Sequence, residues 1–135
     1  MVEIELPIHS IMPIAVDHDQ RRRLITAAVT GQLTADELFE FMTTRWGTAR
    51  ADHGVLFDAR DMIVDQTAGD VRVLVSRLEP HQAALRAPFA MVVAAHLAFG
   101  MARMYQTLLD GVGISRARVF WTTSEAELWL WTETH

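Results

Sequence analysis

Residues His53 to Leu78 read HGVLFDARDMIVDQTAGDVRVLVSRL, and this segment decides the fold that we expect. It contains a short apolar strand, Val55 to Phe57, which ends on Asp58. A polar loop follows, and a helix begins near Thr67. Proteins of the α/β class bind their ligands outside the carboxyl ends of the strands, where such loops lie. We therefore expect the functional surface of the chain between Asp58 and Thr67.

The composition predicts one folded domain without cysteine or lysine chemistry. Of 135 residues, 50% are hydrophobic and 21% charged, so the chain can bury a core. It has no cysteine, and all 12 basic residues are arginine, which excludes disulfides, thiolates and Schiff bases. The formal net charge of −5 argues against a nucleic-acid partner. The acidic start MVEIELP and the short apolar runs predict a cytoplasmic protein that is not integral to a membrane.

Outside the opening segment, strands and helices alternate. We expect strands at residues 13–16, 24–30, 55–57, 89–95 and 117–121, and helices at 34–46, 67–78, 97–109 and from 124 onward. This order, β-β-α-β-α-β-α-β-α, predicts the α/β class, with a mixed, mostly parallel sheet and an N-terminal hairpin. One domain covers residues 13–135, after an N-terminal arm at residues 1–12. The cluster Arg21 to Arg23 is expected in the turn of the hairpin.

Three sequences have the pattern of a helix start. Thr34–Glu37 and Ser124–Glu127 are full capping boxes, in which the first side chain accepts a backbone N–H and the glutamate bonds back. Thr67–Asp70 is a weaker version, because an aspartate replaces the glutamate. We expect one helix to begin at each of them.

Several of these segments together resemble a known family. They are GQLT (31–34), FDARD (57–61), DVRVL (70–74), LAFGMARMYQTLL (97–109) and VFWTTSEAELWLW (119–131). In content and spacing they resemble the STAS-like family related to the anti-sigma-factor antagonist SpoIIAA, whose fold is similar to lipid-binding CRAL-TRIO domains. The resemblance extends over roughly residues 13–131 and implies a single STAS-like (SpoIIAA-like) domain that acts as a regulatory or protein-interaction module.

The resemblance also implies a site of modification. Antagonists of this type carry a phosphorylated serine in an Asp-Ser-Ser-Gly sequence at a helix start. At about that place this chain has Asp65-Gln66-Thr67-Ala68-Gly69, without the serine. Thr67 is the one hydroxyl there, so it is the residue that a phosphorylation would use. The alternative is that Thr67 is simply the N-cap of its helix.

The candidate binding residues are Asp58, Asp65, Thr67, His96 and Arg103. Asp58 and His96 each follow a central strand, and Thr67 and Arg103 lie on the helices that come next. We expect Asp58, Thr67, His96 and Arg103 to line one shallow cleft that could hold an anion. An Asp58–His96 pair could also serve an enzyme, but no nucleophile motif accompanies it. The favoured function is therefore non-enzymatic, and no catalytic residue or cofactor is expected.

Three further readings concern other side chains. The six histidines are scattered without metal-ligand spacing, so no metal site is expected. Methionines such as Met42, Met62 and Met91 form core or, alternatively, line an adaptable pocket. Such a pocket would make the chain a carrier of a small lipophilic or anionic ligand. Trp129 and Trp131 point in different directions on the last helix, so we expect one to pack inward and the other to anchor a homodimer.

Overall fold

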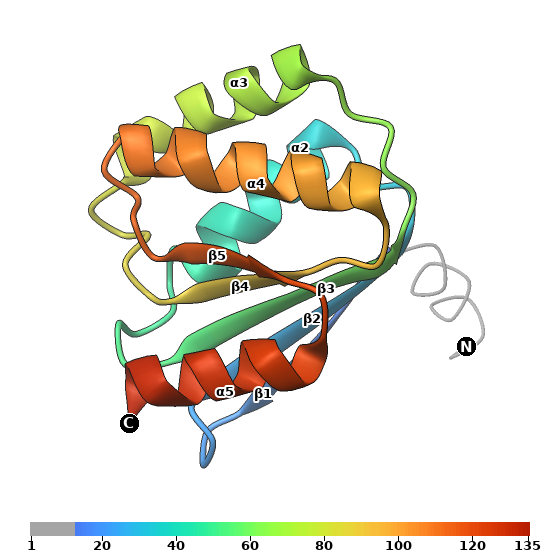
Figure 1. Ribbon diagram of the computed structural model, residues 1–135. Helices are drawn as coiled ribbons and strands as arrows, with labels where there is room; N and C mark the ends of the chain where they lie inside the picture. The colour runs from blue at the N-terminus through green and yellow to red at the C-terminus, as the bar shows by residue number, and fades with distance from the viewer. Residues whose placement is uncertain (1–12) are drawn as a thin grey trace, which may run out of the picture.

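The computed structural model describes residues 13–135, and the arm expected at residues 1–12 lies outside the described residues. Five strands form one sheet in the order β1-β2-β3-β4-β5 (Figure 1). They are β1 (Ile14–Asp19), β2 (Leu24–Gly31), β3 (Gly54–Met62), β4 (Phe89–Val92) and β5 (Ala117–Phe120). The first pair is antiparallel and the remaining neighbours are parallel. The sheet is therefore mixed and mostly parallel, with an N-terminal hairpin.

Helices cover both faces of this sheet. They are α2 (Ala35–Phe41), α3 (Ala68–Leu78), α4 (His96–Gly111) and α5 (Thr123–Thr134), with two short helical turns, η1 (Met42–Trp46) and η2 (Glu79–His81). Figure 1 shows α2, α3 and α4 on one face and α5 alone on the other. Each of the first three links two consecutive parallel strands, which cannot be joined by a tight turn. The α/β class, the five-stranded mixed sheet and the four helices are confirmed, whereas η1, η2 and several boundaries differ from the expectation.

The helix starts agree with two of the three capping sequences. The Thr34 and Thr67 side chains each accept the backbone N–H three residues later, and the acidic side chain there bonds back. The prediction for Ser124–Glu127 is wrong. The N-cap of α5 is Thr122, whose hydroxyl accepts the Glu125 N–H at 3.1 Å. Because β5 already ends at Phe120, Thr122 is the first residue that can cap, and Ser124 falls inside the helix.

The larger core lies between the sheet and helices α2 to α4. At its centre the Trp46 ring is completely buried and stacks on Phe89, with 4.3 Å between the ring centroids. The indole N–H of Trp46 donates to the Ala87 carbonyl at 2.8 Å, so its polar atom is paired. Phe57 is 5% exposed and packs against both Phe41 and Phe89. This aromatic cluster fixes the distance between η1 and the central strands.

A smaller core lies between the sheet and α5. Leu130 is 2% exposed and packs against Leu24, Leu56 and Val92. A Cβ on Gly54 would lie 3.0 Å from the Leu130 side chain, so the glycine allows α5 to approach β3 closely. Since Leu56 faces α5 and successive strand residues alternate between the faces, Asp58 faces the same side. Within residues 13–135, no helix is both long and apolar enough to span a membrane.

Candidate functional site

Asp58 does not end its strand, and it lies on the α5 side of the sheet. β3 continues for four residues beyond it, to Met62. The Asp58 carboxylate accepts two hydrogen bonds from the Arg60 guanidinium, at 2.9 and 2.8 Å, and one from the Arg60 backbone N–H. These hydrogen bonds hold the pKa of Asp58 below its usual value, against the effect of partial burial. Asp58 is therefore an ionised partner of Arg60.

The segment after β3, residues 63–67, is extended, and its side chains point alternately to the outside and into the protein. Ile63, Asp65 and Thr67 point outward and are exposed, whereas Val64 and Gln66 are partly buried. On the outward side, the amide nitrogen of Gln32 donates to the Asp65 carboxylate at 3.1 Å. The Thr67 hydroxyl accepts the Asp70 N–H at 3.1 Å, and the Asp70 carboxylate accepts the Thr67 N–H at 2.8 Å. Thr67 is thus an exposed N-cap, which agrees with the alternative that the sequence analysis gave for this residue.

His96 and Arg103 lie on the outer side of α4. His96 is the first residue of the helix, is exposed, and meets the Trp121 ring edge to face at 5.5 Å between centroids. Arg103 is exposed as well, because the buried side of α4 is formed by Ala98, Ala102, Tyr105 and Leu109. Its guanidinium is therefore directed away from the sheet.

The cleft expected from Asp58, Thr67, His96 and Arg103 is not formed by these four side chains together. The sheet separates Asp58 from Thr67 and Arg103, which lie on helices of the opposite face. The error arises from the end of β3, because a strand ending at Asp58 would have left the carboxylate at the edge of the sheet. The alternative of an enzyme that uses an Asp58–His96 pair also loses support, since the Asp58 carboxylate is already paired with Arg60.

The two tryptophans of α5 differ in exposure, as expected from their spacing. Trp129 is partly buried and packs against Phe120, with 5.6 Å between ring centroids. Trp131 is 54% exposed and stacks on the His135 ring, with 3.5 Å between the ring centroids. Leu128 is 68% exposed and lies three residues before Trp131, hence on the same side of the helix. The outward side of α5 therefore carries two large apolar side chains.

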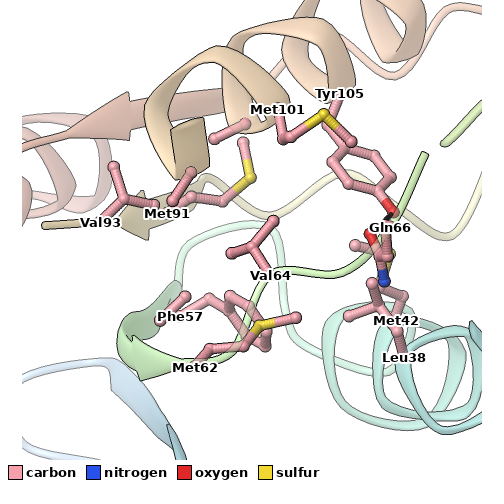
Figure 2. A pocket seen from close by; sticks show the side chains of 13 residues that line it. Leu38, Met42, Phe57, Met62, Val64, Gln66, Met91, Val93, Met101 and Tyr105 are labelled. Atoms are coloured by element: carbon pink, nitrogen blue, oxygen red, sulfur yellow. Dashed lines mark hydrogen bonds between the residues drawn. The ribbon is translucent and has the colours of Figure 1, made fainter. Parts of the chain in front are cut away.

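A pocket lies on the other face of the sheet, beneath the segment that follows β3. Figure 2 shows its lining, which comes from β3, β4, α2, η1, α4 and the extended segment. Four methionines contribute to this lining: Met42, Met62, Met91 and Met101. Phe57, Val64 and Val93 add further apolar surface. The pocket lies near the carboxyl ends of β3 and β4, where ligand sites of parallel sheets occur.

Two polar side chains interrupt this apolar lining, and both were missed by the sequence analysis. The Tyr105 hydroxyl donates to the amide oxygen of Gln66 at 2.6 Å. Burial, and secondarily the charge of Asp70, raise the pKa of Tyr105 far above its usual value, so the phenol stays neutral. One signal was available: Tyr105 lies on the buried side of a helix, and a buried tyrosine needs a hydrogen-bond partner.

Among residues 13–135, no group of three histidine, aspartate or glutamate side chains could hold a metal ion. Comparisons of the sequence with protein-family models and with curated proteins found no match. The STAS-like assignment therefore remains a proposal.

Proposed function

We propose that the chain is a STAS-like, cytoplasmic module that acts by binding a protein partner and not by catalysis. Support for the STAS-like fold comes from the order of the elements. Four parallel strands follow one another in the sheet, consecutive strands are linked by helices on one face, and the last helix covers the other face. Apart from the short turns η1 and η2, the order of strands and helices along the chain is the one expected from the segments that resemble the family.

The observation that carries the proposal is the outward side of the segment from Asp58 to Thr67 and of α3. Ile63 is 55% exposed in this segment, and Val73 on α3 is 61% exposed. Exposed apolar side chains that are grouped together and surrounded by polar ones are typical of contact surfaces, and we infer that Ile63 and Val73 belong to one such group. We call the outward residues Ile63, Asp65, Thr67 and Val73 the contact surface.

The charge around the contact surface indicates the chemistry of the partner. Asp61, Asp65 and Asp70 are all exposed between the end of β3 and the first turn of α3. The exposed Arg72 adds a basic side chain beside Val73. A partner that covers Ile63 would bring its own rim close to these carboxylates, and a basic rim would be attracted to them. The expected partner is therefore a protein with an apolar recess surrounded by arginine or lysine. Phosphorylation of Thr67 would add further negative charge to this surface.

The experiment compares variants of the full chain as bait in cells of its natural source. The tagged wild type, Ile63→Ser and Asp65→Asn are purified with their associated proteins, which are quantified by mass spectrometry. We expect one protein at near-stoichiometric amount with the wild type, reduced about tenfold or more with Ile63→Ser. Its retention should fall as the salt concentration rises, because exposed charges are screened.

The matched control is Leu128→Ser, which removes an exposed apolar side chain from α5, on the other face of the sheet from α3. This variant should retain the partner of the wild type. If the partner is lost with Leu128→Ser and kept with Ile63→Ser, the contact surface lies on α5 and the proposed surface is wrong. Circular dichroism of each variant excludes a general loss of the fold.

A further inference from the structure

The pocket beneath the extended segment contains one polar atom without a partner. The Gln66 amide nitrogen is buried, and no hydrogen-bond acceptor within residues 13–135 reaches it. Figure 2 shows this nitrogen on the side of Met42 and Leu38, while the amide oxygen points to Tyr105. An unpaired buried donor is costly, about 1–3 kcal/mol. Because the nitrogen is buried beside Met42 and Leu38, a ligand that supplies the acceptor must first displace a neighbouring side chain.

The orientation of the amide follows from the length of its hydrogen bond. The distance between the Tyr105 and Gln66 atoms is 2.6 Å. This length is usual for an O–H···O bond and short for an N–H···O bond, for which ~2.9 Å is typical. The oxygen of Gln66 therefore faces Tyr105, and the nitrogen is the atom left for a ligand. A ligand that matches it must present an acceptor.

The surroundings of the nitrogen indicate the rest of the ligand. The other lining side chains are apolar, apart from the Gln66–Tyr105 pair itself. Water in a pocket usually makes two to four hydrogen bonds, and this lining has no polar side chain besides Gln66 and Tyr105, which already bond each other. The pocket lining also has no arginine or histidine, and the charge of Asp70 is close enough to act on Tyr105. An anionic head group would therefore be unfavourable, and a neutral molecule fits.

We propose that this pocket binds a small neutral apolar molecule through one carbonyl oxygen, which accepts a hydrogen bond from Gln66. The free space is about 50 Å³, well above the ~10–15 Å³ that one water needs. It is below the roughly 300–1,000 Å³ of pockets for drug-sized ligands, so the ligand is a short molecule. The four methionines enlarge the space by changing rotamers, since their side chains are unbranched and flexible.

The test uses butyl methyl ketone as the probe and the methionine methyl groups as reporters. The full chain is labelled with ¹³C at the methionine methyls and titrated with the ketone in the millimolar range. We expect shifts at Met42, Met62, Met91 and Met101, which line the pocket, and smaller ones at Met104, which does not. Hexanoate, which has the same number of carbons, should produce much weaker shifts because it is charged.

Three variants test the role of Gln66. Gln66→Leu with Tyr105→Phe removes both polar partners together, and the ketone should bind about fivefold more weakly. Tyr105→Phe alone leaves the Gln66 amide free, so ketone affinity should be kept or increased. Gln106→Leu is the matched control, because it removes a glutamine of α4 that does not line the pocket. It should bind as the wild type does.

Two results would overturn the inference. The first is a titration in which the pocket methionines shift no more than Met104. The second is an unchanged ketone affinity in the double variant, provided that its methyl spectrum shows an intact fold. Neither result bears on the protein partner, because the contact surface is on the outer side of the segment.

Discussion

The hydroxyl of Tyr105 and the amide oxygen of Gln66 lie 2.6 Å apart and join α4 to the segment that follows β3. The two residues are separated by 39 positions in the sequence. The bond holds Gln66 inward, so that its neighbours Asp65 and Thr67 point outward. It therefore connects the lining of the pocket with the geometry of the contact surface.

Loss of this hydrogen bond should destabilise the fold measurably. Tyr105→Phe leaves the buried Gln66 amide without any partner, and we expect a loss of about 1–2 kcal/mol in the free energy of unfolding. Gln66→Leu leaves the tyrosine hydroxyl unpaired and should cost a similar amount. The double variant should cost less than the sum, because no orphaned group remains. Urea denaturation of the four proteins measures the coupling, and strictly additive losses would mean that the bond contributes nothing.

For the contact between Tyr105 and Gln66, the sequence predicts the burial of one residue but not its hydrogen-bond partner. The helical spacing of Phe99, Ala102, Tyr105 and Leu109 in the sequence predicts one buried side of α4, and all of these except the partly buried Phe99 are buried. The partner could not be predicted, because Gln66 is a polar residue in a loop and only the tertiary structure turns it inward. Apolar periodicity reports which side of an element is buried, and it carries no information on pairs between distant polar residues.

The aromatic cluster on the central strands gives a second prediction. Phe57 is 5% exposed and Val92 is fully buried on the adjacent strand, and both lie in short apolar runs of the sequence, which are typical of buried strands. Phe57→Ala should cost about 3–5 kcal/mol, from lost burial and from the cavity left between Phe41 and Phe89. Ile63→Ala is the control, since its side chain is 55% exposed, and it should change stability by less than about 0.5 kcal/mol. Equal losses for the two variants would contradict the burial of Phe57.

The extent of β3 was the main error in the fold, and its cause is physical. Phe57 and Ala59 face the larger core, whereas Asp58 and Arg60 face the side that α5 only partly covers. A half-covered strand has polar residues at every second position, and the sequence FDARD fits that alternation as well as it fits a turn. The pairing of Asp58 with Arg60, two residues apart on one face, was the signal for a strand.

The Asp58–Arg60 pair predicts a pH dependence of stability. Because the pKa of Asp58 is lowered in the folded state, the pair stabilises the fold fully above the unfolded pKa, roughly 3.9. The stabilisation is lost as the pH falls below that value towards the folded pKa. Asp58→Asn should therefore cost about 0.5–1 kcal/mol at pH 7 and less at about pH 3.

Denaturation of the wild type and the variant at both pH values measures this difference. Asp110→Asn is the control, because Asp110 is an exposed carboxylate near the end of α4, and its effect should be close to zero at pH 7. A cost of Asp58→Asn that stays constant between the two pH values would show that Arg60 does not stabilise the ionised carboxylate.

The last prediction concerns the outward side of α5. Leu128 and Trp131 are 68% and 54% exposed, and their spacing of three residues places them on one side of the helix. A second copy of the chain could cover both side chains at once in a symmetric contact. Light scattering should then report a dimer for the wild type and a monomer for Trp131→Glu, since a buried charge without a partner opposes association. Thr107→Glu, at an exposed threonine of α4 on the other face of the sheet, is the control and should remain dimeric. A wild type that is monomeric at all accessible concentrations would rule out the homodimer, and the two side chains would then be ordinary exposed residues of a surface helix.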